Sequence, residues 1–272
     1  MDNRPIGFFD SGLGGLTCIS HLMKTLPNER IIYFGDTART PYGSKATSTI
    51  RGFSAQIADF LVQRNVKMIV IACNTVSSTS LEDLRERYPD IPVLGIIEPA
   101  AARVAEVWQE TNSVGIIGTK VTIRSKTHER LIHRLNPRIP IHGMACPVLV
   151  PLIEEGIIEH DIMDLSIRYY LDHFLSYHKI DTLVLGCTHY PLIRTNIEKL
   201  YPHLSIINPS EEIVNSIETE LLERDLLAET ASHDNTYYAS DLSENFINMI
   251  NRIFDQSEFR VAFKNFDLDN CK

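Results

Sequence analysis

The chain has 272 residues, of which 44% are hydrophobic and 22% are charged. This length and composition are typical of one large or two medium globular domains, and they exclude a stapled mini-protein, a collagen-like or coiled-coil fibre and a wholly disordered chain. The formal net charge of −9 gives no basic surface that could hold a polyanion, so we expect no nucleic-acid partner.

Cysteines occur at positions 18, 73, 146, 187 and 271, with no C-x-x-C pair among them. Their number is odd and their spacing is scattered, so we expect free thiols in a reducing compartment, with neither a disulfide framework nor a structural zinc site. The first residues lack the apolar stretch of a signal peptide, and the apolar runs fall well short of the ~18 residues of a membrane span. The sequence therefore predicts a cytoplasmic protein with no membrane partner and no bound metal.

Short β-branched runs alternate along the chain with segments of helical periodicity, which predicts an α/β fold with mostly parallel sheets. In chain order the expected strands are Ile6–Phe9, Ile31–Phe34, Met68–Ala72, Val93–Ile97, Val114–Ile117, Ile139–His142, Thr182–Gly186 and Ser205–Asn208. The expected helices cover residues 14–26, 46–64, 77–87, 99–110, 125–135, 148–156, 160–178 and 191–200. Beyond residue 210 the pattern changes to a helix at 211–229 and two short strands, Thr236–Ser240 and Phe259–Phe263, around a helix at 242–254.

The expected strands repeat at a long offset, which indicates an internal duplication. Two matches have an offset of 108: Ile6–Ser11 with Val114–Thr119, and Ile31–Gly35 with Ile139–Gly143. Two more follow in the same order: Ile71–Thr75 with Leu185–His189 at 114, and Ile96–Pro99 with Ile206–Pro209 at 110. Each half of the chain then carries one cysteine directly after an equivalent strand.

A glycine-rich turn, Asp10-Ser11-Gly12-Leu13-Gly14-Gly15, follows the first strand and opens a helix. Its glycines permit a tight turn and a close approach of the backbone to an anion, as in a phosphate-binding loop. The spacing is not G-x-G-x-x-G, and no Gly-Lys-Ser/Thr follows. A plain strand-to-helix turn capped by Ser11 therefore remains an equal alternative.

Cys73-Asn74-Thr75 and Cys187-Thr188-His189 each follow a strand and precede a helix. A helix N-terminus stabilises a thiolate, so we expect both thiol pKa values to lie below about 8.5. Two thiols at equivalent ends of two repeats suit the inversion of a carbon stereocentre, in which one base removes a proton and an acid on the opposite face returns one. We expect Cys18, Cys146 and Cys271 to be structural or exposed bystanders, and His21, His128 and His133 to lie on helix surfaces.

These motifs, together with Pro41-Tyr42-Gly43, Gly118-Thr119 with Thr122, and Val150-Pro151-Leu152-Ile153-Glu154, resemble in order the motif set of the bacterial glutamate racemases. The resemblance covers residues 6 to about 210. It implies a cofactor-independent enzyme, with glutamate as its small-molecule substrate, that interconverts L- and D-glutamate and supplies D-glutamate for peptidoglycan. It also implies a homodimer, and two lobes related by a pseudo-twofold axis: residues 1–97 plus 208–272, and residues 98–207, with the active site in the cleft between them.

The resemblance also assigns roles to single residues. Cys73 would take the proton from D-glutamate and Cys187 from L-glutamate, and the thiols would be assisted by Asp10, His189 and Glu154. The substrate would be held by Asp10, Ser11, Pro41, Tyr42, Gly43, Asn74, Thr75, Thr119, Thr122, Thr188 and His189. Such a set suits a dianionic amino acid, because hydroxyl and amide donors bind carboxylates and a carboxylate receives the ammonium.

Two alternatives remain at this level. An aspartate racemase is the nearest, but its second motif is typically Cys-Thr-Glu, where this chain has Cys187-Thr188-His189, which favours glutamate. The other is an α/β module that binds an anion or a nucleotide on the turn after Asp10 and performs no catalysis.

Overall fold

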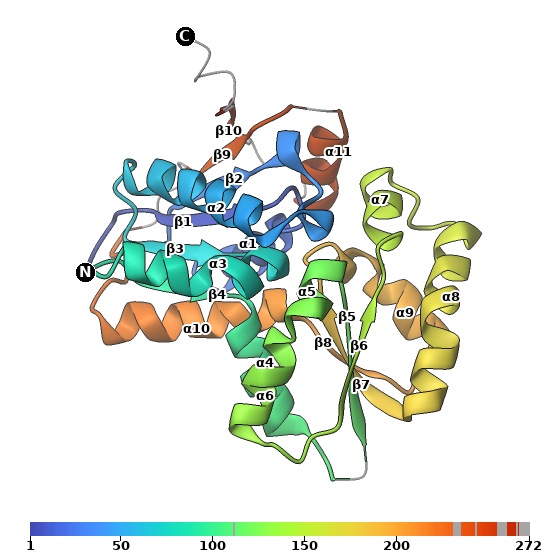
Figure 1. Cartoon of the computed structure of the whole chain (residues 1–272). Coiled ribbons are helices and arrows are strands. Elements are labelled where there is room, and N and C mark those ends of the chain that lie inside the picture. Colours follow the sequence, from blue (N-terminus) through green and yellow to red (C-terminus); the bar gives the residue numbers. More distant parts are fainter. Residues whose placement is uncertain (111, 231–234, 243, 255–259, 265, 267–272) are drawn as a thin grey trace.

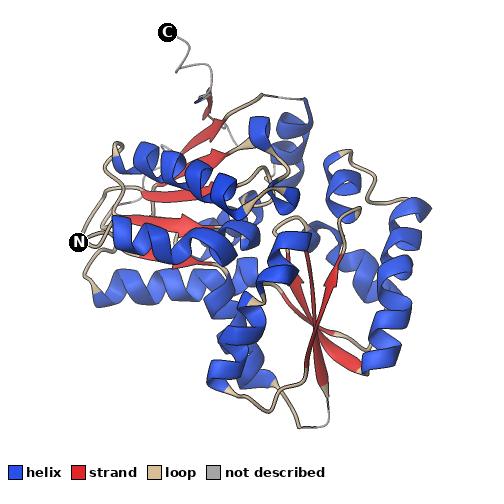
Figure 2. Ribbon diagram, viewed as in Figure 1, coloured by secondary structure: helices blue, strands red, loops and turns tan. Residues whose placement is uncertain are grey.

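The computed structural model describes residues 1–110, 112–230, 235–242, 244–254, 260–264 and 266. Its strands form two separate parallel sheets that lie side by side, each flanked by helices (Figure 1, Figure 2). This arrangement confirms the predicted α/β fold with two similar lobes.

The first sheet has the strand order β10-β9-β2-β1-β3-β4, and neighbouring strands are parallel throughout. Its strands are β1 Ile6–Asp10, β2 Ile31–Gly35, β3 Met68–Ile71, β4 Val93–Gly95, β9 Thr236–Ala239 and β10 Arg260–Phe263. Phe8 and Phe9 of the central strand belong to two different buried clusters, because successive side chains point to opposite faces of a sheet. Both faces of this sheet are therefore covered, as a parallel sheet requires.

The second sheet has the order β6-β5-β7-β8, again with parallel neighbours. Its strands are β5 Ser113–Gly118, β6 Ile141–Ala145, β7 Ile180–Gly186 and β8 Ser205–Ile207. This order repeats the β2-β1-β3-β4 order of the first sheet. The duplication inferred from the sequence is thus present in the topology, and β9 and β10 are an addition to the first sheet that the second does not share among the described residues.

Strand register tests the sequence matches one by one. Ile6 pairs with Ile31 and Met68 in the first sheet, and Val114 pairs with Ile141 and Thr182 in the second. The offsets of 108 for the central strands and 114 for the cysteine-bearing strands are therefore confirmed.

The other two offsets are wrong by two or three residues. Ile31 corresponds to Ile141, because Pro140 has no amide hydrogen for the ladder and β6 begins only after it. In the same way Val93 corresponds to Ile206, since they pair with the equivalent residues Ile69 and Leu183.

Helices connect the strands and cover the sheets. They are α1 Leu16–Thr25, α2 Thr47–Val62, α3 Asn74–Arg87, α4 Ile97–Val107, α5 Lys120–Ser125, α6 Thr127–Leu135, α7 Leu149–Glu154, α8 Asp161–His178, α9 Arg194–Leu200, α10 Pro209–Glu223 and α11 Glu244–Ile253, with short 3₁₀ turns η1 Thr37–Arg39, η2 Tyr42–Ser44 and η3 Tyr190–Ile193. Helices α2 and α3 bury their apolar residues on one face of the first sheet, and α1 and α10 on the other. Helices α4 and α6 share a cluster with the second sheet.

Several helix predictions differ from the structure. Helix α4 ends at Val107 rather than 110, and the start of the helix expected at 191–200 is the 3₁₀ turn η3. Helix α3 begins at Asn74, directly after Cys73, although its Ser- and Thr-rich start indicated a helix only from 77. The helix expected at 125–135 begins at Thr127, as α6, because Lys126 has a left-handed backbone with φ of 52°, and the short helix α5 before it was not predicted. Helix α10 spans Pro209–Glu223 rather than 211–229, because Asn208 caps it and Pro209 occupies its first turn. Phe259, the first residue of the last expected strand, lies outside the described residues.

Among the described residues, no helix combines the length and the apolar composition needed to cross a membrane.

Candidate active site

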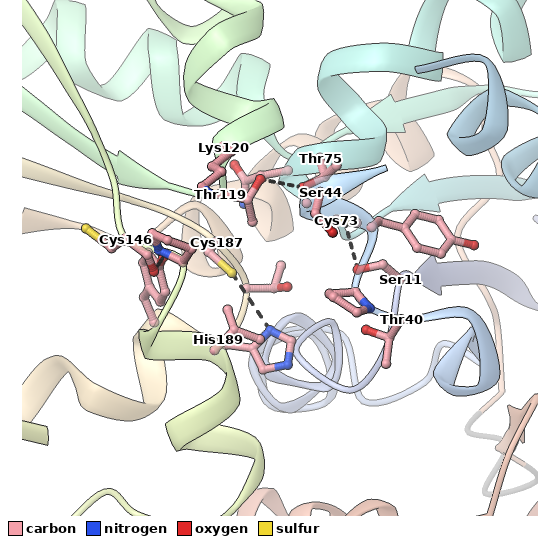
Figure 3. A pocket seen from close by; sticks show the side chains of 18 of the residues that line it. Ser11, Thr40, Ser44, Cys73, Thr75, Thr119, Lys120, Cys146, Cys187 and His189 are labelled. Carbon is pink, nitrogen blue, oxygen red and sulfur yellow. Dashed lines mark hydrogen bonds between the residues drawn. The ribbon is translucent and has the colours of Figure 1, made fainter. Parts of the chain in front are cut away.

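A cavity of about 310 Å³ lies between the two sheets, at the carboxyl ends of their strands (Figure 3). Segments that follow β1, β2 and β3 of the first sheet and β5, β6 and β7 of the second contribute to its wall. Ligand sites in open α/β sheets occur at this edge of the strands. The cavity is therefore the candidate active site.

Most of the residues singled out in the sequence line this one cavity. They are Ser11, Pro41, Tyr42, Gly43, Cys73, Asn74, Thr75, Thr119, Glu154, Cys187, Thr188 and His189. Asp10 and Thr122 do not line it, but each is buried directly behind residues that do.

Cys73 and Cys187 come from different sheets and lie on opposite sides of the cavity (Figure 3). Each follows a strand that pairs with the central strand of its sheet, at the same position in the register. The two thiols are therefore equivalent by topology as well as by sequence.

The Cys73 thiol is enclosed on the side of the first sheet. Its Sγ donates a hydrogen bond to the Ser11 Oγ at 3.3 Å, and the residue is 4% exposed. Burial raises the pKa of this thiol to about 12, and the nearby Asp10 carboxylate adds to the rise. The predicted lowering of the Cys73 pKa by the helix N-terminus is thus wrong, because desolvation outweighs the contribution of the helix amides.

Cys187 has a titratable partner instead. His189 Nδ1 lies 3.8 Å from its Sγ, and the other ring nitrogen, Nε2, lies 3.0 Å from Glu154 Oε1. Burial opposes a charge on His189, but its hydrogen bonds to Cys187 and Glu154 outweigh burial and raise its pKa well above the usual value near 6.5. This side of the cavity therefore holds a thiol, an imidazole that favours its protonated form, and a carboxylate in one chain of contacts.

Two amides of the turn Asp10–Gly15 are already bonded to a carboxylate of the chain itself. The buried Asp10 carboxylate accepts hydrogen bonds from Gly12 N at 3.2 Å and Gly15 N at 3.1 Å, and Thr188 Oγ1 donates to it at 3.4 Å. A Cβ on Gly14 would lie 2.5 Å from Thr188 Oγ1 and 2.7 Å from His189 Nδ1. The glycines thus allow close contact between the two lobes, which argues against the anion-binding module.

Three threonine hydroxyls join the lobes at the other end of the cavity. Thr75 at the start of α3 lies 3.0 Å from Thr119 and 3.2 Å from Thr122, which belong to the second lobe. Next to them, both amide atoms of the buried Asn74 side chain lack a hydrogen-bond partner. A buried amide without a partner costs free energy, so Asn74 is available for a polar ligand in the cavity.

Sequence reasoning missed several lining residues, namely Thr40, Ser44, Lys120, Cys146, Pro147, Val150, Pro151 and Tyr190. Val150 and Pro151 lie within the motif that ends at Glu154, and for the others their position next to the recognised motifs was the only available signal. Cys146 is buried in the cavity wall, and Figure 3 shows its sulfur turned away from the middle of the cavity, which is compatible with the structural role expected for it. Cys18 is buried, as a structural thiol would be, and Cys271 lies outside the described residues.

His128 is a correction. It was expected on a helix surface, but only 3% of it is exposed, and burial lowers its pKa to about 4. No group of three or more His, Cys, Asp or Glu side chains within the described ranges is arranged to hold a metal ion.

Comparisons with known proteins agree with this geometry. Residues 16–217 match the family described as Asp/Glu/Hydantoin racemase. The chain is 44% identical over 254 residues to the glutamate racemase of Geobacter metallireducens, covering 93% of each, and 43% identical over 244 residues to that of Neisseria meningitidis, covering 89% of this chain and 90% of the relative.

Solved structures give the same result. A glutamate racemase from Francisella tularensis, crystallised in complex with D-glutamate, is 38% identical and superposes with a TM-score of 0.92 over 98% of this chain and all of that chain. An aspartate racemase from Picrophilus torridus is 15% identical, with a TM-score of 0.56 over 80% of this chain and 94% of that chain, and shares the fold alone.

Proposed function

The chain belongs to the Asp/Glu/hydantoin racemase family and, within it, to the glutamate racemases, and we propose that it interconverts L- and D-glutamate with Cys73 and Cys187 as the two acid/base groups. The observation that carries the proposal is the placement of these thiols at equivalent strand ends on opposite sides of one cavity. Inversion at Cα needs a base on one face and an acid on the other, and this arrangement provides both.

In the L-to-D direction, the Cys187 thiolate removes the Cα proton of L-glutamate, and the electron pair of the broken C–H bond remains on a planar carbanion. The Cys73 thiol then gives its proton to the opposite face, which forms D-glutamate and leaves Cys73 as a thiolate. The raised pKa of Cys73 favours the thiol that this direction requires. The protonated His189 beside Cys187 supplies the counter-charge for a thiolate there.

The substrate residues suit an amino acid with two carboxylates. We assign one carboxylate to the hydroxyls of Thr75 and Thr119 and to the amide of Asn74, all of which line the cavity and are able to donate hydrogen bonds. Thr122 does not reach the cavity, and its part is to orient the other two hydroxyls. Asp10 acts similarly from behind, by holding Thr188 and the turn that carries Ser11.

We propose the division of the chain into residues 1–97 plus 208–272 and residues 98–207. The parallel pairing of β9 with β2 supports the return of the C-terminal residues to the first lobe. The cleft between the lobes is then the place where substrate enters.

The proposed product, D-glutamate, would serve peptidoglycan synthesis in the cytoplasm. A reducing compartment fits the described cysteines, Cys18, Cys73, Cys146 and Cys187, which are all free thiols.

We further propose a homodimer formed through α8. Its outer face carries the exposed apolar residues Ile162, Leu165, Tyr169 and Tyr177, spaced three, four and eight residues apart in one stripe. Asp161 and Asp164 lie in the first turn of this helix and Lys179 caps its end, so two antiparallel copies bring opposite charges together. Light scattering should give a dimer for the natural chain and a monomer for Tyr169→Glu, and a natural chain that is monomeric at 50 µM would refute the dimer.

The reaction is tested by circular dichroism with pure L- or D-glutamate and no added cofactor. We expect the signal to decay to zero from either enantiomer, and Cys73→Ser and Cys187→Ser each to abolish the decay. Parallel runs with D-aspartate separate glutamate racemase from aspartate racemase. A normal rate in either cysteine variant would exclude the two-base mechanism.

Deuterium exchange in D₂O separates the roles of the thiols. Cys73→Ser retains a base for L-glutamate only, so it should exchange the Cα proton of L-glutamate and not that of D-glutamate, and Cys187→Ser should show the reverse. The opposite pattern would interchange the two assignments.

A further inference from the structure

The C-terminal addition to the first sheet contacts the segment that leads into the cavity wall. Directly after β9, Ser240 N donates to Gly35 O at 3.1 Å, and Ala38 N donates to Ser240 Oγ at 2.9 Å. The next residue pairs with Thr37: Asp241 N donates to its Oγ1 at 2.8 Å, and that hydroxyl donates to Asp241 O at 2.7 Å. Residues 240 and 241 therefore fix the start of the segment after β2.

Asp36 links this contact to the cavity. Its carboxylate is fully buried. Oδ1 accepts a hydrogen bond from Ser240 Oγ at 2.8 Å, and Oδ2 accepts one from Arg39 Nε at 2.7 Å and another from the Tyr42 hydroxyl. The Arg39 guanidinium carbon lies 4.0 Å from the centroid of the Phe53 ring, and this cation–π contact holds the cation in place. The Tyr42 hydroxyl is thus held by a carboxylate whose other oxygen is held by Ser240.

Tyr42 belongs to a loop that forms part of the cavity wall. Residues 40–44 line the cavity, and within them Gly43 packs so closely on the second lobe that a Cβ there would lie 2.6 Å from Thr119 Cβ. The loop has no room to move closer to Thr119. A shift of Tyr42 therefore moves the loop relative to the second lobe and changes the width of the cavity.

We propose that Ser240, which does not line the cavity, is a positioning residue. It acts through Asp36 and Tyr42 on the loop of residues 40–44, which does line the cavity. Without its hydroxyl, Ala38 N–H and Asp36 Oδ1 both lose a partner, and the carboxylate can rotate toward the free amide. That rotation withdraws Oδ2 from the Tyr42 hydroxyl. The inference rests on the proposed racemase activity, because its effect is measured on that reaction.

The test compares Ser240→Ala with Ser54→Ala. Ser54 is equally buried, but it donates only to Ile50 O within α2, so it is a matched loss of one buried hydroxyl. We expect Ser240→Ala to raise KM about tenfold, as befits the loss of a hydrogen bond to a carboxylate, with kcat changed by less than about threefold. Ser54→Ala should leave KM within about twofold. Ser240→Thr, which keeps the hydroxyl, should restore KM.

A double-mutant cycle with Tyr42→Phe checks the route. Since this variant lacks the hydroxyl that Asp36 holds, adding Ser240→Ala should have little further effect on KM. The inference would be overturned by an unchanged KM in Ser240→Ala. It would also be overturned if Ser240→Ala raised KM by the same factor in the Tyr42→Phe background as in the natural chain. If Ser240→Ala does not fold, the weaker donor in Ser240→Cys should raise KM in the same direction, and an unchanged KM there refutes the proposal. A natural chain that does not racemise glutamate would instead refute the proposed function.

Discussion

Gly14→Ala is a sharp test of the contact between the lobes. The added Cβ would lie 2.5 Å from Thr188 Oγ1, 2.7 Å from His189 Nδ1 and 2.8 Å from the Thr188 carbonyl carbon. Since tolerable contacts begin near 3.4 Å, these atoms must move away by about 0.9, 0.7 and 0.6 Å. One of the three atoms is backbone, so a change of rotamer does not relieve the clash.

Two magnitudes follow from this displacement. Overpacking of this kind costs about 1–3 kcal/mol of stability. Activity should suffer more, because the displaced imidazole makes the 3.0 Å contact with Glu154 and the 3.8 Å contact with Cys187. A misplacement of ~1 Å can cost ~100-fold in rate, so we expect kcat to fall by roughly 30-fold to 100-fold.

Gly52→Ala is the matched control, since a Cβ there meets nothing within 4 Å and the residue lies inside α2. It should gain about 0.5–1 kcal/mol of stability and keep its activity. Initial rates by circular dichroism from each enantiomer, together with urea unfolding, measure both effects. Enantiomers have equal free energies, so kcat/KM must fall by the same factor in both directions. A folded Gly14→Ala variant whose rate stays within threefold of the natural chain would show that His189 does not need this close contact.

Three further predictions concern single charged groups. The pKa of His128 is about 4 in the folded chain and near 6.5 in the unfolded chain, so acidification between these values should lower the free energy of unfolding by up to about 3 kcal/mol. Urea unfolding of His128→Gln should lack that loss of stability. Parallel curves of stability against pH for the variant and the natural chain would contradict this prediction. Lys67→Met leaves Glu29 buried without its 2.6 Å ion-pair partner, so it should lower the free energy of unfolding by about 3–5 kcal/mol. Adding Glu29→Gln should recover part of that loss, and an unchanged Tm in Lys67→Met would refute the prediction. Lys120 is exposed at the cavity and is the one Lys or Arg among its described lining residues. Lys120→Gln should therefore raise KM a few-fold at low salt, and the increase should disappear in 0.5 M KCl because salt screens the charge. A difference in KM that persists at high salt would exclude an electrostatic role.

The equivalence of Cys73 and Cys187 was predictable because both follow strongly apolar strands, which fix an unambiguous offset. The β6 strand was harder, since it lies at a sheet edge, is only partly buried and contains Gly143, so its hydrophobic signal is weak. The apolar run before it includes Pro140, which moved the match by two residues.

Three features of the structure could not be read from the sequence, for different reasons. His128 lies in the first turn of α6, directly after the left-handed Lys126, and the local sequence carries no signal that this side chain is buried. The contact between Ser240 and Asp36 joins residues 204 apart, and the C-terminal strands have no repeated partner that could reveal their place. Burial also reversed the expected shift in the Cys73 pKa, which local sequence does not encode.

The shared strand order has a consequence for ancestry. Each four-stranded unit supplies one thiol, and neither unit alone encloses the cavity. A progenitor made of one such unit could have formed a complete site only by pairing two identical copies around a twofold axis. Fusion of the two genes would then have freed each copy to diverge, so that one thiol acquired Ser11 as its neighbour and the other His189.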